Sequence, residues 1–577
     1  GTFMIEKKTI LDRYRGEFFE GEWPSIIEML NLNTHRYGER PAFSHFEGNT
    51  KHSITYSELL ERVYGVATFL KSKGIKKGDR IVLNGKNSPA WGISYLGIQA
   101  IGAVVVPLDN QLESERVDAL SLFSEARAIF ADSDVLEKSE ATFEFRVSLT
   151  TSSNSDFIDF STIKGAKKAP APLPTENDLA AILFTSGTTG NEKGVVLTHG
   201  NFMSNAFQAS DPNFLNFTYE DVFYGLLPLH HSYSMTAVFL EAIKQGSELI
   251  FGHSLAVSKV ISEMRNGKIS LFLAIPLLYN KFLAGLMKKV REKGAVAYAL
   301  IRTLMVVNGF LRKVFKINPG RRWFHQLLDG IGMASNRICI CGGGPLSPKT
   351  FQQYQQLGLD FIQGYGLTET APILTLNPVS RFKVKSVGKV LPLIEMRIDE
   401  PDLLGVGEVL VKGPNVCQGY YKDPQNTAEL FTEDGFLKTG DLGHLDKENY
   451  LYLKGRAKNL IVTEGGKNVY PEEIEDHFQL YGEIDQVLVR GYMANKAAKA
   501  EGIEALIYPN IDYFDGKGSD YVTREIDKIV REVNKKLVAY KKIDKTTILE
   551  KPMEMTTTKK IQRNKVARTI GRLLGSS

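Results

Sequence analysis

Cysteine is scarce in this chain, with three residues among 577: Cys339, Cys341 and Cys417. Three thiols do not make a paired disulfide framework, and the two that lie close together are in an apolar segment too poor in other ligands for a zinc site. A reducing cytoplasm therefore fits best. No signal peptide is visible, and the three residues before Met4 are set aside as an addition.

Excess charge of one sign and long apolar runs are also missing. The 71 basic and 66 acidic side chains leave a net charge of +5, which is too small to indicate a nucleic-acid partner. The most membrane-like stretch, residues 295–311, contains Arg302, Asn308 and Gly309, so we predict no membrane-spanning helix. The length predicts two or more globular domains.

The chain does contain a loop rich in glycine and hydroxyl groups. The apolar run Leu179–Phe184 predicts a buried strand, and Thr-Ser-Gly-Thr-Thr-Gly-Asn-Glu-Lys follows it. Glycine lets backbone N–H groups turn toward an anion, while hydroxyls and a lysine add donors and positive charge. The spacing differs from the common P-loop. A flexible surface turn is the alternative, but we predict a polyphosphate site at Thr185, Ser186, Gly187, Thr188, Thr189, Gly190 and Lys193.

A second motif occupies residues 363–370, where a predicted strand ends in Gln-Gly-Tyr-Gly-Leu-Thr-Glu-Thr. Thr368 and Glu369 would suit a helix cap. Alternatively, Tyr365 stacks on a flat base, Thr368 approaches a phosphate, and Glu369 supplies the hard oxygen ligand that Mg²⁺ prefers. About twenty residues upstream, a glycine run permits a ligand to approach the backbone closely.

Predicted helices and strands alternate along the N-terminal part of the chain. Helical patterns at 56–73 and 94–101 alternate with strand patterns at 80–83 and 103–108, which predicts parallel sheets covered by helices. Residues 165–175 read as a linker. A break falls near residues 455–458, after which a helix is predicted to begin at Pro471 with acidic residues in its first turn.

In this order, the motifs resemble those of the adenylate-forming enzymes, which include acyl-CoA synthetases, peptide-synthetase adenylation domains and luciferases. The resemblance covers roughly residues 25–570 and implies an α/β fold. A large N-terminal domain, 1–457, would combine parallel and mixed β-sheets flanked by helices with a distorted β-barrel, and a small mobile α+β domain would occupy 458–577. The ATP-binding residues implied in addition to the first loop are Gly343, Gly344, Pro345, Gln363, Gly364, Tyr365, Gly366, Thr368, Asp441 and Arg456.

The resemblance also implies catalytic roles. Lys560 matches the family's catalytic lysine, with Lys559 where a glycine is usual, and its ammonium would bridge the carboxylate and the α-phosphate. Whether Lys559 shares this role stays open. Thr185 and Glu369 are expected around the reacting phosphate and at Mg²⁺. His231 matches the histidine beside the acyl pocket, where a positioning role is favoured over acid–base catalysis.

Two further segments match parts of the family that serve the second half-reaction. Lys458 matches the hinge about which the small domain rotates. Gly465 and Gly466 match the glycine loop that lines the tunnel for the pantetheine of CoA.

A basic insertion, residues 281–330, bears on the identity of the acid. It carries eleven Lys/Arg against two Asp/Glu and resembles the long-chain fatty acyl-CoA synthetases. It is either a surface helical pair with a solvated basic face or a patch that rests on an anionic membrane. Nearby apolar residues suit an alkyl tunnel, although such residues are usually core: Phe223, Leu226, Phe239, Leu240 and residues 271–273.

The sequence therefore predicts a cytoplasmic long-chain fatty acid–CoA ligase, with peripheral contact at the inner membrane face as a further expectation. ATP, Mg²⁺ and a fatty acid would give acyl-adenylate and pyrophosphate, and CoA would then form the thioester and release AMP. A carrier protein's phosphopantetheine as acceptor and a catalytically silent lipid-surface scaffold are the alternatives. A homodimer is left open, and no nucleic-acid partner is expected.

Overall fold

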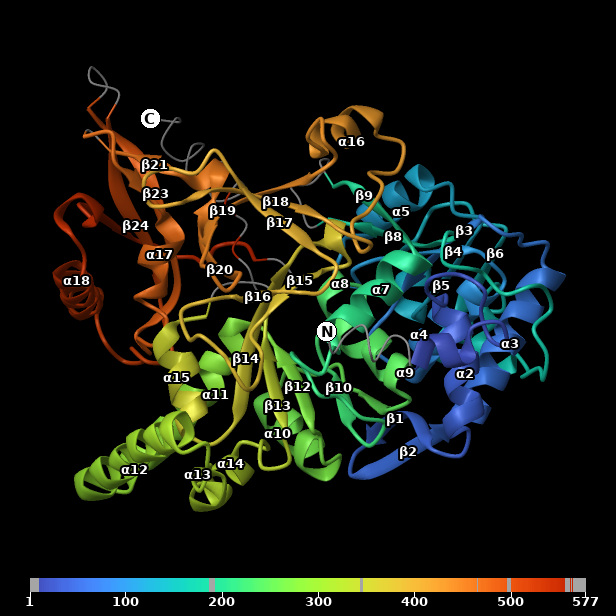
Figure 1. Cartoon of the computed structure of the whole chain (residues 1–577), viewed down its shortest axis with the longest axis horizontal. Helices are drawn as coiled ribbons and strands as arrows, with labels where there is room; N and C mark the ends of the chain where they lie inside the picture. Colours follow the sequence, from blue (N-terminus) through green and yellow to red (C-terminus); the bar gives the residue numbers. More distant parts are fainter. Residues whose placement is uncertain are drawn as a thin grey trace.

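The computed structural model describes residues 10–185, 192–342, 346–463, 465–495, 500–555, 561 and 563. Across these residues the strands form sheets of seven, thirteen, three and two strands. The seven-stranded sheet lies at one side of the molecule, and the C-terminal elements lie at the opposite side above the long sheet (Figure 1). The observed architecture confirms the predicted α/β class with a small C-terminal domain.

The seven-stranded sheet leads into the first motif. Its order is β7-β6-β5-β3-β4-β8-β9, and all neighbours are parallel except β8 and β9, which pair antiparallel. The strands are β3 (Arg80–Asn84), β4 (Val104–Pro107), β5 (Ala128–Ala131), β6 (Phe145–Ser148), β7 (Ile158–Asp159), β8 (Leu179–Phe184) and β9 (Gly194–Thr198). The accompanying helices are α3 (Tyr56–Ser72), α4 (Pro89–Ala100), α5 (Ser114–Phe123) and α6 (Ser133–Lys138), with a 3₁₀ turn η1 (Phe160–Thr162).

Helix α4 begins earlier than predicted. The sequence pattern placed its start at residue 94, whereas the helix begins at Pro89 because Ser88 caps it and accepts a hydrogen bond from the Trp91 N–H.

The thirteen-stranded sheet joins a mostly parallel half to an antiparallel half, and its edge strand β2 pairs antiparallel with β1. Its order is β17-β18-β19-β20-β16-β15-β14-β13-β12-β10-β11-β1-β2. The half that includes β14 is built from β1 (Pro41–Glu47), β2 (Thr50–Thr55), β10 (Val222–Gly225), β11 (Glu248–Phe251), β12 (Leu271–Ala274), β13 (Ile338–Cys341) and β14 (Asp360–Gly366). The antiparallel half, at the position expected for the distorted barrel, is an open run of β15 (Ile373–Leu376), β16 (Gly388–Val390), β17 (Glu395–Asp399), β18 (Gly407–Lys412), β19 (Leu437–Leu445) and β20 (Tyr450–Arg456).

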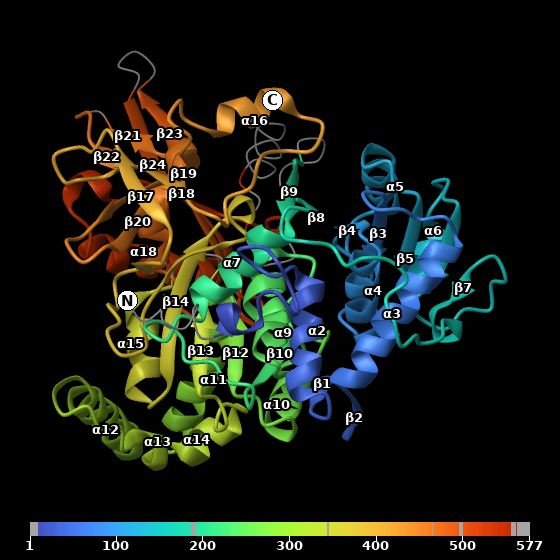
Figure 2. The same ribbon diagram turned by 45° about the vertical axis from the view of Figure 1, so that its right-hand side comes forward.

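Helices cover this sheet and link it to the first one (Figure 2). They are α2 (Ile26–Tyr37), α7 (His199–Ala209), α8 (Ser232–Ser234), the π-helical η2 (Met235–Leu240), α9 (Glu241–Gln245), α10 (Val257–Asn266), α11 (Pro276–Glu292), α12 (Ala295–Val314), α13 (Gly320–Trp323), α14 (His325–Gly330), α15 (Pro348–Gln356), the 3₁₀ turn η3 (Thr368–Thr370) and α16 (Pro424–Leu430). Helix α7 has a capping box in which Thr198 and Asn201 bond each other's backbone N–H groups.

The C-terminal elements have a core of their own. Ile503, Ile507, Ile526 and Val533 are buried there, between a three-stranded sheet and helix α18. The elements are η4 (Ala457–Asn459), β21 (Ile461–Val462), β22 (Asn468–Val469), α17 (Pro471–Asp476), β23 (Ile484–Asn495), β24 (Ala500–Pro509), α18 (Ser519–Lys535), η5 (Ala539–Lys541) and β25 (Lys545–Ile548).

One expectation about the basic insertion needs correction. Because of Arg302, Asn308 and Gly309 no membrane-spanning helix was predicted here, but α12 is one continuous helix of 20 residues. Among the helices of the described ranges it is long and apolar enough to cross a membrane by length and composition alone. The polar residues do not break it because a helix satisfies its own backbone whatever its side chains face.

Candidate active site

The first motif lies where β8 and β9 diverge. The Thr185 N–H donates to the Lys193 carbonyl (2.9 Å), and the Lys193 N–H donates to the Thr185 hydroxyl (3.2 Å). These bonds close the base of the loop and hold the two residues together at the edge of the sheet. The loop residues predicted to bind phosphate between them, Ser186, Gly187, Thr188, Thr189 and Gly190, lie outside the described residues.

The second motif turns sharply out of β14. A Cβ on Gly366 would lie 1.8 Å from the Pro372 carbonyl oxygen, so this position accepts only glycine. The tight approach lets the Leu367 N–H donate to that same carbonyl (3.0 Å). The turn presents Thr368, whose hydroxyl lies 3.2 Å from that of Ser232. The Tyr420 hydroxyl donates to the Glu369 carboxylate (3.1 Å).

Both motifs face one cavity of about 760 Å³. Its polar walls are formed by Thr185, Lys193, His231, Ser232, Gly364, Tyr365, Gly366, Thr368, Glu369, Tyr420, Asp423, Thr439, Arg456 and Lys458. Its apolar walls are formed by Ala209, Leu215, Phe217, Ala237, Ile340, Ile373 and Leu376, with the carboxylate residue Glu241 beside them. The cavity therefore joins a hydrogen-bonding region to an apolar one, and its volume is within the range of small-molecule sites.

Tyr365 and Arg456 are linked through a buried carboxylate. Asp441 accepts hydrogen bonds from the Tyr365 hydroxyl and from Nη1 of Arg456, the latter at 2.8 Å. Asp441 and Arg456 are register partners on β19 and β20, so sheet pairing fixes the ion pair. Burial raises the pKa of the Tyr365 phenol well above its ordinary value, and the nearby Asp441 charge adds to the effect. Asp441 does not line the cavity directly but holds two residues that do.

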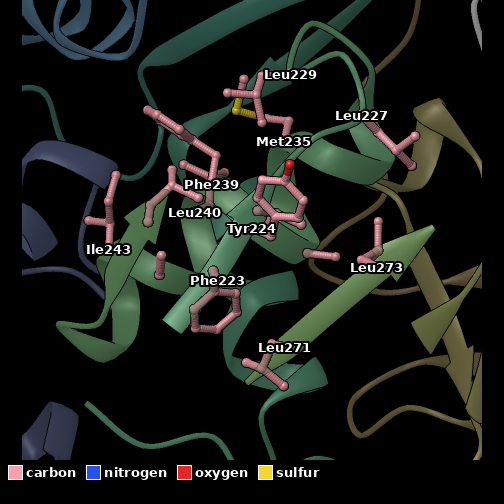
Figure 3. Close-up of a cluster of buried hydrophobic side chains, with 14 of the residues drawn as sticks. Phe223, Tyr224, Leu227, Leu229, Met235, Phe239, Leu240, Ile243, Leu271 and Leu273 are labelled. Atoms are coloured by element: carbon pink, nitrogen blue, oxygen red, sulfur yellow. The ribbon is translucent and has the colours of Figure 1, made fainter. Parts of the chain in front are cut away.

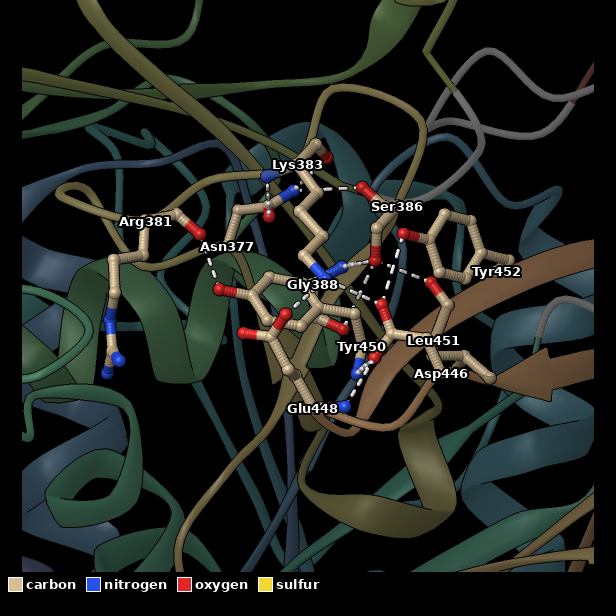
Figure 4. A network of polar contacts seen from close by, with 10 residues as sticks. All are labelled: Asn377, Arg381, Lys383, Ser386, Gly388, Asp446, Glu448, Tyr450, Leu451 and Tyr452. Atoms are coloured by element: carbon tan, nitrogen blue, oxygen red, sulfur yellow. Dashed lines mark hydrogen bonds and ion pairs between the residues drawn. The ribbon is translucent and has the colours of Figure 1, made fainter. Parts of the chain in front are cut away.

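Gln363 supports the site without lining it. Its side-chain Nε2 donates to the Ser386 carbonyl (2.7 Å). The segment around Ser386 belongs to a polar network in which Lys383 bonds the carboxylates of Asp446 (2.7 Å) and Glu448 (3.1 Å) (Figure 4). Gln363 therefore fastens β14 to the segment before β16, and Lys383 in turn fastens that segment to the β19–β20 turn.

Glu369 has the electrostatic character of a cation ligand. Burial raises the pKa of its carboxyl, while the hydroxyl of Tyr420 and the charges of Arg456 and Lys193 lower it. A half-buried carboxylate that lines the cavity together with Thr185 and Lys193 fits a Mg²⁺ ion that arrives with a nucleotide, because such an ion needs only one or two protein oxygens besides phosphate and water. Within the described ranges, no group of three or more His, Cys, Asp or Glu residues converges as a protein-only metal cage.

Lys458 lies at the junction between the large sheet and the C-terminal elements. It lines the main cavity and also a second cavity of about 280 Å³, bounded by β21, β23 and Arg563. Burial lowers the pKa of its ammonium, and the neighbouring Arg456 and Arg563 charges lower it further. The junction is fastened by Glu472, which accepts from the Arg456 N–H (3.3 Å) and the Asn459 amide (2.9 Å).

Several predicted residues are not brought into this cavity. Gly465 and Gly466 are exposed in the turn between β21 and β22, and neither lines the two cavities described above. The predicted adenine loop, Gly343, Gly344 and Pro345, lies outside the described residues, as do Lys559 and Lys560.

Family models match most of the chain. Residues 30–421 match the AMP-binding enzyme model, and residues 458–571 match the AMP-binding enzyme C-terminal domain. The chain belongs to the AMP-binding enzymes. It is 29% identical over 553 residues to "Long-chain-fatty-acid--CoA ligase FadD15" of Mycobacterium bovis, covering 89% of this chain and 90% of that protein.

Other relatives of this AMP-binding enzyme carry different names. It is 27% identical to a "Feruloyl-CoA synthase" of Amycolatopsis sp., covering 82% of this chain and 85% of that protein. Among solved structures, the anthranilate CoA ligase AuaEII in complex with anthranoyl-AMP superposes with a TM-score of 0.77 at 19% identity, covering 96% of this chain and 98% of that one. At that identity the likeness shows the shared fold.

Sequence reasoning missed two residues that shape the site of this AMP-binding enzyme. Tyr420 bonds Glu369, and its ring lies 5.2 Å from the Lys193 ammonium, so it joins the two motifs. Glu472 fastens the junction. The sequence indicates Tyr420 only as part of a Gly-Tyr turn, and nothing in the sequence links it to a carboxylate 51 positions away.

The expectation that the apolar residues near the cavity line an alkyl tunnel is wrong for the five residues named next. Phe223, Phe239, Leu240, Leu271 and Leu273 pack together in the core (Figure 3). None of them lines the cavity. They belong to elements next to it, so an apolar pattern on β10, η2 and β12 signals core rather than substrate contact. The cavity wall instead takes side chains from neighbouring positions, such as Ala237 on η2.

Proposed function

We propose that this chain activates a long-chain fatty acid with ATP and Mg²⁺ as an acyl-adenylate and then transfers the acyl group to CoA. The observation that carries the proposal is the single cavity whose polar walls hold both motifs and whose apolar walls continue from them. An adenylate of a fatty acid has the same division, because a charged nucleotide is joined directly to an alkyl chain.

In the first half-reaction the carboxylate oxygen attacks the α-phosphorus of ATP and pyrophosphate leaves. Thr185, Lys193 and Thr368 would donate to the phosphates, and Tyr365 would support the base. Glu369 would hold Mg²⁺, which neutralises phosphate charge when bound. Lys560 would bridge the two anions as they approach, which requires the C-terminal segment to reach the cavity.

In the second half-reaction the thiol of CoA attacks the acyl carbonyl, and AMP leaves. We assign Lys458 as the hinge, because it lies on the short 3₁₀ turn η4 that separates β20 from the C-terminal elements. Rotation there would carry Lys560 away and bring the turn at Gly465 and Gly466 toward the cavity. Closure during both steps would keep water from the mixed anhydride.

One relative supports a second acceptor. The chain is 26% identical to the chloroplastic "Long-chain-fatty-acid--[acyl-carrier-protein] ligase AEE15" of Arabidopsis thaliana, covering 85% of this chain and 77% of that protein, so a carrier protein is the second candidate acceptor.

The test offers the purified protein ATP and Mg²⁺ with palmitate, ferulate or o-succinylbenzoate, and then CoA or a phosphopantetheinylated carrier protein. We expect ATP–pyrophosphate exchange to be fastest with palmitate and a thioester to form with CoA. Faster exchange with an aromatic acid would contradict the fatty acid as the proposed substrate. A thioester that forms only on the carrier protein would contradict CoA as the proposed acceptor. Absence of exchange with every acid would support a silent scaffold.

A further inference from the structure

Helix α12 exposes an apolar face along its whole length. The exposed apolar positions are three, four or seven residues apart, which places them on one side of the helix: Val296, Leu300, Val307, Phe310 and Val314. Val296 is 85% exposed and Phe310 is 57% exposed. Figures 1 and 2 show α12 at the outer edge of the molecule, next to α13. A contiguous apolar face of this kind marks an interaction surface rather than scattered surface hydrophobics.

The opposite face of α12 meets the body of the protein through both apolar packing and hydrogen bonds, and Met305 is fully buried there. Asn308 is fully buried and donates to the Gln356 carbonyl (3.0 Å) while accepting from the Gly320 N–H (2.8 Å). Arg312 donates to the carbonyls of Gln355 (2.8 Å) and Leu359 (2.9 Å) and pairs with Asp360. The inner face of α12 is therefore fixed by hydrogen bonds as well as by apolar packing, and the outer face is apolar although it points away from the body of the protein.

Positive charge surrounds this face. Lys289 and Lys293 precede α12, and Lys313 and Lys316 lie at its C-terminal end; all four are exposed. The insertion has two acidic residues, and one of them, Asp329, is paired with Arg265 from outside the insertion. Trp323 on the neighbouring helix α13 is 45% exposed, and tryptophan favours the boundary between apolar and aqueous phases.

We propose that the α12 face docks into the surface of an anionic lipid bilayer, with the helix lying in the membrane plane. An apolar face rimmed by lysine and arginine matches the acyl boundary and the charged head groups together. A second copy of this chain fits less well, because a two-fold contact through α12 would bring the two basic rims together. A helix that crossed the bilayer would have to separate Arg312 from Asp360 and expose Asn308 to hydrocarbon.

The proposal is independent of which acid the enzyme activates, because its test is binding and not turnover. Sedimentation with vesicles of equal parts phosphatidylglycerol and phosphatidylcholine should pull down the full chain, whereas pure phosphatidylcholine should not. The double variant Val307→Glu/Phe310→Glu should bind the anionic vesicles at least about tenfold more weakly, since it places two carboxylates on the face that would enter the bilayer. Its ATP–pyrophosphate exchange with a water-soluble acid should stay at the level of the unaltered protein.

The matched control is Leu404→Glu, an exposed leucine in the loop between β17 and β18, which should bind vesicles like the unaltered protein. A second arm, Lys313→Glu/Lys316→Glu, should remove the preference for phosphatidylglycerol and the sensitivity to salt. Failure of the unaltered protein to bind anionic vesicles would overturn the proposal. A concentration-dependent dimer in solution that Val307→Glu/Phe310→Glu abolishes would overturn it too, by assigning the face to a second copy.

Discussion

The polar and apolar ends of the cavity are built in different ways. At the polar end several side chains are held by hydrogen bonds, as Asp441 holds Tyr365 and Arg456, and Tyr420 holds Glu369. At the apolar end, side chains from α7, η2, β13 and β15 line the wall with apolar groups. On the proposed function, we expect changes at the polar end to alter the rate of chemistry and changes at the apolar end to alter which acid is taken.

The largest effect is expected from the lysine assigned to the polar end. Lys560→Ala should slow adenylate formation by about 10³-fold or more, because a charge that stabilises the transition state is removed. Thioester formation from supplied acyl-adenylate should stay within about tenfold, since that step does not join two anions. Rapid-quench measurement of each half-reaction checks this. Equal loss in both steps would remove Lys560 from its role, and Lys559→Ala shows whether its neighbour shares it.

A second test addresses the cation site. Glu369→Gln should raise the Mg²⁺ concentration for half-maximal pyrophosphate exchange by about tenfold or more, because a neutral amide is a poorer ligand for a hard cation. Titration of Mg²⁺ at saturating ATP measures it, with the exposed Glu433→Gln as control. An unchanged requirement would contradict the assignment.

The apolar end should respond in selectivity rather than in rate of chemistry. Ala237→Phe adds a ring to the cavity wall and should lower kcat/KM for palmitate relative to a short acid by about 10-fold or more. Phe239→Leu on the same element, which packs in the core, should leave that ratio unchanged even if stability falls. An equal loss of kcat/KM for all acids in Ala237→Phe would contradict the expectation that the apolar end affects selectivity rather than rate.

Helix α7 contributes Ala209 to the apolar wall, and its first residue, His199, is expected to affect stability rather than activity. Burial lowers the pKa of His199 to about 3, and its Nδ1 accepts from the Ile26 N–H (3.2 Å). Because the unfolded state binds the proton below pH 6.5 and the folded state does not, stability falls as pH decreases from about 6.5 toward 3. The slope contributed is about 1.4 kcal/mol per pH unit. Urea unfolding between pH 4 and 6 should show a free energy of unfolding that depends less steeply on pH in His199→Gln than in the unaltered protein. An equal dependence on pH in the two proteins would contradict the role given to His199.

The sequence predicts the polar end better than the apolar end for a physical reason. Phosphate binding needs glycine and hydroxyl groups next to each other in the chain, so Thr185 and Glu369 lie within short motifs. The acyl wall needs only apolar volume, which core residues such as Phe223 supply equally well, so pattern alone does not separate wall from core. Contacts between distant segments, as between Tyr420 and Glu369, leave no local signal.

The same limit applies to the basic insertion. Its charge and helical spacing are visible in the sequence, and α11 and α12 form as helices. The direction in which α12 faces is not visible in the sequence, where Asn308 is only a polar residue within an apolar segment and Arg312 is only one of several basic residues. In the folded chain they are the contacts that fix it to α15 and β14.

The most direct test of the account is a crystal structure with a stable palmitoyl-adenylate analogue, such as the acyl sulfamate. We expect the adenosine to lie beside Tyr365 and the ribose near Arg456. The alkyl chain should run along Phe217, Ala237 and Ile373. An alkyl chain that leaves the protein by another route, or a nucleotide that does not contact Tyr365 and Glu369, would contradict it.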